Sequence, residues 1–252
     1  MKIITNKFQR RTGRSITLAA LLAALWGFTQ SASAQTIYID FGNSTTQMSS
    51  PNAGTYWNNI TNLNGSSGGG ASTGVPIALV TDDNSSSGIS LTMTTLFANE
   101  NHTGTASPTT SVSEFNYSDL GIDSLYISGT NTAEFTLSGL DSSKEYVFTM
   151  FASRAAGGIR TADYTFTGIN TDTVTLDAAN NTSSLVTTTS ISPDGSDEIT
   201  FSMALSSDNN QGYAYLGGMQ ITVVPEPASA AIAFGALTLL FTVVRRRYNA
   251  HS

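Results

Sequence analysis

The feature that most constrains the fold of this chain is a two-residue alternation of apolar and polar side chains, repeated in several short segments. It is clearest in residues 89–97, 133–138, 199–205 and 219–223. Because successive side chains of an extended strand point to opposite faces, this period predicts strands with one buried and one solvated face. No segment between residues 35 and 223 shows a convincing helical period of comparable length. The chain is therefore predicted to form antiparallel sheets.

Turn-forming residues separate further candidate strands. These strands are predicted at residues 36–41, 124–127, 146–151, 163–167, 173–176 and 184–190. Gly, Asn, Asp and Ser, which favour turns, lie between them at short intervals. Residues 146–151 are apolar at nearly every position and predict a central strand covered on both faces. We expect one all-β domain over residues 35–223, a single antiparallel two-sheet sandwich with jelly-roll-like connections.

Composition excludes several kinds of site. The chain has no Cys, which excludes disulfides, Cys-ligated zinc, iron–sulfur clusters and thiol nucleophiles. Its histidines are His102 and His251, too few for most His-based metal sites. Between residues 35 and 223, the three cations Lys144, Arg154 and Arg160 are outnumbered by seventeen acids, which gives a formal charge of −14. Such an acidic body repels phosphate backbones and argues against nucleic-acid binding.

The first 34 residues have the organisation of a secretory signal peptide. Five basic residues come first: Lys2, Lys7, Arg10, Arg11 and Arg14. An apolar run over residues 16–28 follows, too short to span a bilayer comfortably, and Ala32-Ser33-Ala34 offers small residues for cleavage. Signal peptidase is therefore an expected partner, with residues 1–34 removed after export.

The last 29 residues, 224–252, have three parts. Pro225-Glu226-Pro227 comes first, residues 228–244 carry no charge, and Arg245–Arg247 follow. The uncharged run is long enough for a short transmembrane helix, at about 1.5 Å per residue. The arginines place its end on the cytoplasmic side, so residues 35–223 are expected outside. One interpretation of this tail is a plain membrane anchor.

The order of these three parts also resembles the PEP-CTERM sorting signal. The sorting motif comprises Pro225, Glu226, Pro227, Arg245, Arg246 and Arg247. The resemblance implies a Gram-negative bacterium in which an exosortase, a membrane protease, recognises and removes the tail. The inner-membrane precursor would then yield a product at the cell surface or in the extracellular matrix. The tail implies transport and no activity.

A second resemblance concerns residues 133–154, which run from Ala-Glu-Phe-Thr-Leu through Gly-Leu and a turn to Tyr-Val-Phe-Thr-Met-Phe. This hairpin resembles those of fibronectin type III and galactose-binding-like sandwiches. The later strand at 164–168 and the closing strand at 215–221 suit the galactose-binding-like jelly roll better. That resemblance implies a fold and, loosely, a carbohydrate ligand.

Two groups of side chains are candidates for ligand binding. Tyr56, Trp57 and Asn58 combine aromatic rings with an amide, as sugar sites do, although a single Trp in a sandwich often fills one end of the core. Tyr213 and Tyr215 pose the same choice. Arg154 and Arg160 flank a short loop and either clamp a ligand or pair with nearby acids.

Carboxylates and oxygen-rich loops are the candidates for catalysis and for metal binding. Two carboxylates could hydrolyse glycosides if they faced each other, and the candidates are Asp40, Asp82, Asp83, Glu100, Glu114 and Asp163. Structural calcium could lie in one of three oxygen-rich loops at residues 82–84, 194–198 and 208–210, or these loops are ordinary turns. No catalytic residue or other cofactor is predicted.

Taken together, the sequence favours an exported surface or matrix protein without enzymatic activity. The alternative is a carbohydrate-binding module for exopolysaccharide, and a glycoside-active enzyme is the third choice.

Overall fold

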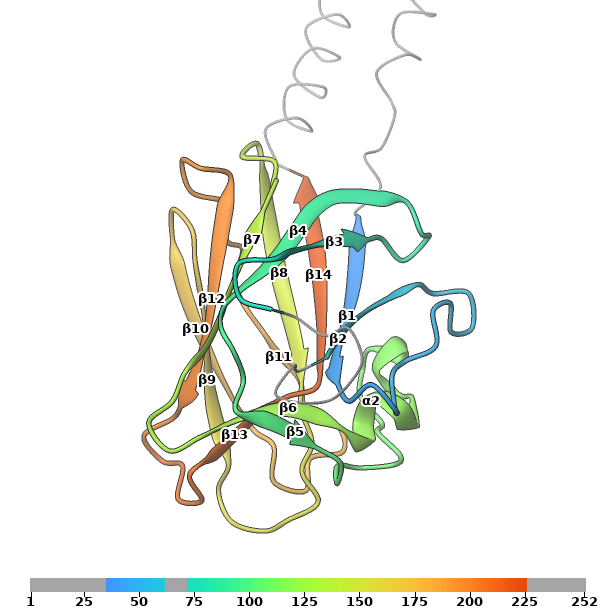
Figure 1. Cartoon of the computed structure of the whole chain (residues 1–252), viewed down its shortest axis with the longest axis vertical. Coiled ribbons are helices and arrows are strands. Elements are labelled where there is room, and N and C mark those ends of the chain that lie inside the picture. Colours follow the sequence, from blue (N-terminus) through green and yellow to red (C-terminus); the bar gives the residue numbers. More distant parts are fainter. Residues whose placement is uncertain (1–34, 62–71, 226–252) are drawn as a thin grey trace, which may run out of the picture. The chain divides into compact units, whose positions relative to one another are not determined.

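The computed structural model describes residues 35–61 and 72–225, and it confirms the predicted all-β sandwich (Figure 1). The fourteen strands of that part are β1 (Thr36–Gly42), β2 (Trp57–Thr61), β3 (Pro76–Val80), β4 (Ser86–Thr95), β5 (Asn99–Asn101), β6 (Ser124–Ser128), β7 (Ala133–Ser138), β8 (Lys144–Phe151), β9 (Thr161–Thr167), β10 (Thr171–Asp177), β11 (Val186–Thr187), β12 (Glu198–Leu205), β13 (Tyr213–Leu216) and β14 (Gly218–Pro225). Two short helices, η1 (Ser113–Phe115) and α2 (Ser118–Ile122), precede β6. The predicted signal peptide and the apolar segment 228–244 lie outside the described residues.

Two large sheets and one small sheet make up the domain. One large sheet has the order β11-β8-β14-β1-β2, and the other β10-β9-β12-β7-β4-β3. The small sheet has the order β13-β6-β5 and lies at the lower end of the view in Figure 1. Among the strands that the structure describes, the pairs are antiparallel, as predicted, with one exception: β1 and β2 run parallel. A parallel pair needs a crossover of about a dozen residues, which the long segment between β1 and β2 provides.

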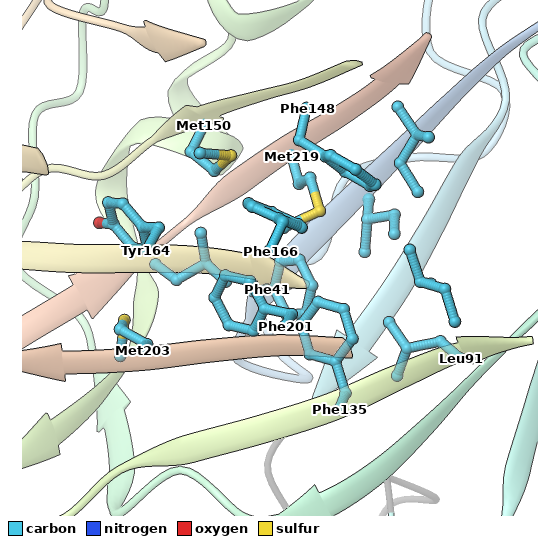
Figure 2. Packing of buried hydrophobic residues seen from close by; sticks show 14 of the residues in the cluster. Phe41, Leu91, Phe135, Phe148, Met150, Tyr164, Phe166, Phe201, Met203 and Met219 are labelled. Atoms are coloured by element: carbon cyan, nitrogen blue, oxygen red, sulfur yellow. The ribbon is translucent and has the colours of Figure 1, made fainter. Parts of the chain in front are cut away.

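The main core lies between the two large sheets and is rich in aromatic rings (Figure 2). Phe148 and Phe166 stack with their centroids 4.0 Å apart, and Phe135 and Phe201 with theirs 4.4 Å apart. All four side chains are completely buried. Burial of each such side chain stabilises the fold by about 1.5–3 kcal/mol, which makes this layer the main source of stability.

A second, smaller apolar cluster covers the other face of the β1 sheet. It consists of Tyr38, Met48, Trp57, Phe115, Leu120 and Phe151. In β1, Ile37, Ile39 and Phe41 point into the main core, whereas Tyr38 and Asp40 point to this second layer. The strand is therefore buried on both faces. Asp40, within this strand, is a buried carboxyl group.

Several predicted strands differ from the observed ones. The predicted strand at 215–221 is divided at Gly217, because β13 pairs in the small sheet and β14 in a large one. The strand predicted at 184–190 contains only β11, and β2, β3 and β5 were not predicted. The remaining predicted strands are present within a few residues of their expected bounds.

The last strand continues beyond the expected end of the domain at residue 223. Val224 and Pro225 pair with Glu145 and Lys144 of β8. On the other side of β14, pairing with β1 ends at Thr222, opposite Thr36. The first proline of the predicted sorting motif therefore ends a strand of the sandwich. Within residues 35–61 and 72–225, no helix is long and apolar enough to cross a membrane.

Candidate functional site

The predicted ligand-binding group around Trp57 belongs largely to the core. Trp57 is 3% exposed and packs against Tyr38, with the ring centroids 5.2 Å apart. Asn58 is also buried, and its amide bonds to the backbone of Tyr38 and Val80. Tyr56 is half-buried at the entry to β2. Trp57 thus fills the second apolar layer, and the structure does not present it as an exposed ring beside a groove.

Arg154 and Arg160 do not form ion pairs with nearby acids, which was one of the two roles considered for them. Arg154 donates through Nη1 to the carbonyl of Thr103, 3.1 Å away. Arg160 donates through Nη1 to the hydroxyl of Tyr215, 3.3 Å away. In the described part of the chain, neither makes a salt bridge; Lys144 does, with Asp141. Only Arg160 lies among aromatic side chains.

Three tyrosines cluster on the small sheet, and Arg160 contacts two of them, Tyr213 and Tyr215. We call Tyr126, Tyr213, Tyr215 and Arg160 the tyrosine platform. The ring of Tyr126 lies 5.8 Å from that of Tyr213 and 5.9 Å from that of Tyr215. The guanidinium carbon of Arg160 lies 5.9 Å from the centre of the Tyr213 ring. Cations attract aromatic faces at this distance, so the two side chains stabilise each other's position.

Strand pairing explains why the rings gather. Tyr126 of β6 lies directly opposite Tyr215 of β13 and opposite Asn99 of β5. Directly opposed residues of antiparallel strands share a face, and so do residues two apart along one strand. Tyr213 therefore lies on the same face as Tyr126 and Tyr215. Tyr215 is buried, Tyr126 is half-buried and Tyr213 is 41% exposed.

The loop before β13 holds the exposed ring in place. Asn209 donates from Nδ2 to the carbonyls of Thr161 and Tyr213, and its Oδ1 accepts from the backbone of Gln211 and Gly212. The neighbouring Asn210 exchanges backbone and side-chain hydrogen bonds with Ile159. The loop that carries Arg160 is therefore tied to the loop that carries Tyr213. The sequence pattern links Tyr213 to Tyr215 but neither to Tyr126 nor to Arg160. The register of the small sheet brings Tyr126 to them, and the bonds between Ile159 and Asn210 bring Arg160.

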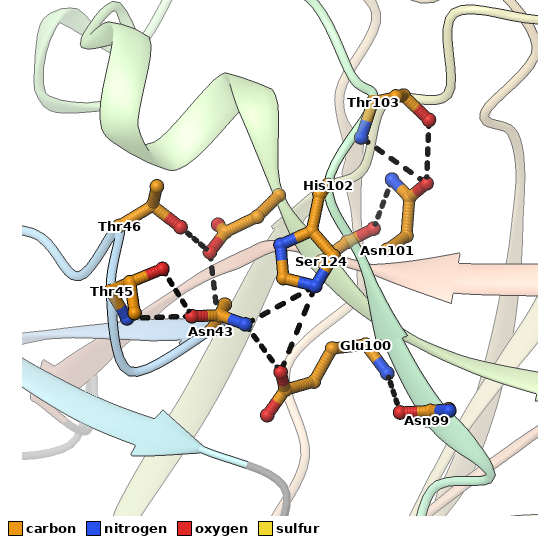
Figure 3. A network of polar contacts seen from close by, with 10 residues as sticks. Asn43, Thr45, Thr46, Asn99, Glu100, Asn101, His102, Thr103 and Ser124 are labelled. Carbon is orange, nitrogen blue, oxygen red and sulfur yellow. Dashed lines mark hydrogen bonds and ion pairs between the residues drawn. The ribbon is translucent and has the colours of Figure 1, made fainter. Parts of the chain in front are cut away.

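A second polar group centres on Asn43, just after β1 (Figure 3). Its amide donates to Glu100 over 2.5 Å and lies 3.2 Å from Nε2 of His102. The Oδ1 of Asn43 accepts from the backbone and hydroxyl of Thr45. The side chain of His102 is 54% exposed and that of Glu100 is largely buried. The arrangement binds the segment after β1 to β5 and to His102, which follows β5.

Two of the predicted carboxylate sites, Asp83 and Asp194, close turns. Asp83 accepts from the Thr81 hydroxyl and the Ser85 backbone, which lowers the pKa of its carboxyl. Asp194 likewise accepts from two backbone N–H groups of its own loop. In both loops the aspartate side chain therefore closes a turn, the role that the sequence offered as the alternative to binding calcium. Among the described residues, no three His, Cys, Asp or Glu side chains converge in a way that could hold a metal ion.

Comparisons with known proteins give weak structural likenesses. No protein-family model and no curated protein matches the chain. The extracellular domain of ANXUR1 from Arabidopsis thaliana matches with a TM-score of 0.39 and 13% identity, over 50% of this chain and 38% of that one. The CBM35 from Cellvibrio japonicus Abf62 matches with a TM-score of 0.30 and 9% identity, over 55% of this chain and 98% of that one.

A further match is the CBM36-1 domain of a multidomain xylanase from the hindgut metagenome of Trinervitermes trinervoides. Its TM-score is 0.28 and its identity 15%, over 53% of this chain and 95% of that domain. The chain thus spans less than half of the plant ectodomain and nearly all of the two small domains.

Proposed function

We propose that the sandwich is a non-catalytic carbohydrate-binding domain and that the tyrosine platform is its binding surface. The observation that carries the proposal is the exposed ring of Tyr213, which contacts both Arg160 and Tyr126. A sugar presents C–H groups on the faces of its ring and hydroxyls around its rim. An aromatic face suits the former, and fixed polar side chains beside it suit the latter.

Rigidity supports this assignment. The ring of Tyr213 has two neighbours within 6 Å, and the loop before it is fixed by the amide of Asn209. A ring that is already fixed loses little conformational entropy when a ligand stacks on it. The ring of Trp57, by contrast, has no exposed face to offer.

Affinity electrophoresis through gels containing bacterial exopolysaccharide tests the proposal. We expect the full chain to be retarded. Tyr213→Ala should lower the affinity for the polysaccharide about tenfold, which corresponds to a loss of about 1.4 kcal/mol of binding free energy. Ile169→Ala is the matched control, because Ile169 is 77% exposed but lies on the β9–β10 turn. Equal retardation of the wild type, Tyr213→Ala and Ile169→Ala would refute binding at the platform.

We further propose that this domain belongs to an exported protein that is sorted through its tail to the cell surface or matrix. The support is the sequence of the two ends: a signal-peptide pattern before residue 35, and Pro-Glu-Pro, an apolar run and three arginines after residue 224. Cell fractionation of the native host tests the location. Cytoplasmic protein that retains Met1 would contradict it.

A further inference from the structure

Two buried carboxyl groups lie side by side on the outer face of β1. Asp40 and Asp123 are each 1% exposed. Asp40 and Gly42 point to the same face of the strand because they are two residues apart. A Cβ atom on Gly42 would lie 2.5–2.7 Å from the carboxylate of Asp123. The carboxylate of Asp123 therefore rests on the backbone of Gly42, next to the side chain of Asp40.

Each carboxylate uses only one of its two oxygens. Oδ2 of Asp40 accepts from the backbone of Met48 over 2.9 Å. Oδ2 of Asp123 accepts from the backbone of Asn43 over 2.6 Å and from the hydroxyl of Thr46. Both Oδ1 atoms are buried and have no hydrogen-bond partner among the described residues. A buried oxygen without a partner is costly, so these two atoms point to a missing ligand.

The charges around the pair are mostly negative. Burial raises the pKa of Asp40 well above its usual range, and the charges of Asp123 and Asp119 raise it further. Burial also raises the pKa of Asp123 to about 6; Glu100 adds to this rise, while His102 opposes it. Neither carboxylate forms an ion pair with Lys or Arg in the described part of the chain. The pair therefore lacks a counter-charge.

We infer that Asp40 and Asp123 hold a divalent cation of the calcium type beneath residues 43–48. Both carboxylates offer oxygen ligands, which calcium prefers, and their two negative charges balance its charge. Neutral oxygens, of the backbone, hydroxyls or water, would complete the six to eight ligands that calcium takes. This site differs from the three loops that the sequence suggested.

The cation would also fix the segment that covers the second apolar layer. Both ends of residues 43–48 are bonded to the carboxylates that would hold the ion, through the backbones of Asn43 and Met48. Met48 in turn packs in the same cluster as Trp57. Binding should therefore register as increased stability of the folded chain.

Thermal unfolding of the full chain in detergent, with calcium chloride or with EGTA, tests the inference. We expect calcium in hundredfold excess over its dissociation constant to raise Tm by about 5–10 °C, and magnesium to raise it much less. Asp40→Asn and Asp123→Asn should abolish this shift. Both variants should be at least as stable as the wild type in EGTA, because the amide removes a buried charge.

Three results would overturn the inference. The first is a calcium shift that both variants retain but that Asp83→Asn, Asp194→Asn or Asp208→Asn removes, which would place the ion in a loop. The second is an equal shift with magnesium. The third is no calcium shift at pH 7.5 together with a Tm that rises as the pH is lowered to 5, which would mean that protons alone neutralise the pair. If Asp40→Asn fails to fold, Asp123→Asn decides.

Discussion

At the residue scale, the amide of Asn58 closes one side of the sandwich. Its Nδ2 donates to the carbonyls of Tyr38 and Val80, and its Oδ1 accepts from the N–H of Val80. Since β2 and β3 are edge strands of different sheets, this side chain provides hydrogen bonds that the two edges do not make to each other. Asn58 is therefore a structural residue, although an amide beside two aromatic residues in the sequence is typical of a sugar site.

Replacing Asn58 by Ala should destabilise the domain by about 2 kcal/mol, because it leaves buried backbone groups without partners. Urea unfolding of the full chain measures the change. Asn131→Ala is the control, since Asn131 is exposed, and it should change stability by less than about 0.5 kcal/mol. An equal effect of the two substitutions would show that the Asn58 bridge contributes nothing.

The buried carboxyl of Asp123 predicts an unusual pH dependence in EGTA. Its pKa is about 6 in the folded chain, above the usual 3.8, so the folded state binds its proton more tightly than the unfolded state does. The stability linked to that proton is complete below about pH 4 and is lost as the pH rises through 6. Asp40, whose pKa is also raised, acts in the same direction.

We therefore expect the free energy of unfolding to fall by about 1–2 kcal/mol between pH 5 and pH 7. Asp123→Asn should remove much of this fall. Asp172→Asn should keep it, because two hydrogen bonds from Thr189 lower the pKa of the Asp172 carboxyl and its proton is lost below this window. Urea unfolding at several pH values decides, and stability that rises toward pH 7 would refute the assignment.

At the element scale, strands were predictable where one face is buried in the main core. β7 and β12 alternate regularly because Phe135 and Phe201 face the other sheet while Thr136 and Ser202 face water. β2 and β3 were missed because their patterns are irregular: β2 carries the buried Asn58, and β3 begins with Pro76 at a sheet edge. β5 has only three residues and gives no period.

One turn shows how closely two elements approach. After β9, a Cβ atom on Gly168 would lie 2.0 Å from the carbonyl oxygen of Ser192. Ile169 also donates its backbone N–H to that carbonyl over 2.9 Å, so the crossing segment cannot move away without losing the bond. Only glycine fits at this crossing.

Gly168→Ala should therefore destabilise the domain by about 2 kcal/mol or more, through displacement of the Ser192 segment. Gly195→Ala is the matched control, because nothing lies within 4 Å of the added carbon. Its effect should be small or slightly stabilising. Thermal unfolding of both variants measures the difference, and similar Tm values would contradict the crowding at Gly168.

At the scale of the whole molecule, the sheet order brings the functional candidates together. β5, β6 and β13 are far apart in sequence, yet they form one small sheet with Tyr126, Tyr213 and Tyr215 on one face. Similarly, Asp40 and Asp123 meet only because the turn after α2 lies against the end of β1. The composition and the alternation of apolar and polar residues predict the architecture. Contacts between residues far apart in the sequence depend on strand register and topology, which that alternation does not specify.

The sandwich meets the proposed sorting signal at the first proline of the Pro-Glu-Pro motif. Pro225 is the final residue of β14 and has a strand partner in β8 but none in β1. Proline has no N–H to donate, so it suits the last position of a strand. A protease that cuts near this motif would need the chain there extended and unpaired.

Replacing Pro225, Glu226 and Pro227 by three alanines should therefore leave membrane insertion intact but block release. Mass spectrometry of the protein from its native host measures the C-terminus, and we expect Ser252 to be retained in the variant and absent from the wild type. Val224→Ala, a change within the strand that leaves the motif intact, should be released like the wild type. A wild-type protein that retains Ser252 would leave only the plain anchor, since an intact tail cannot have passed through a releasing protease.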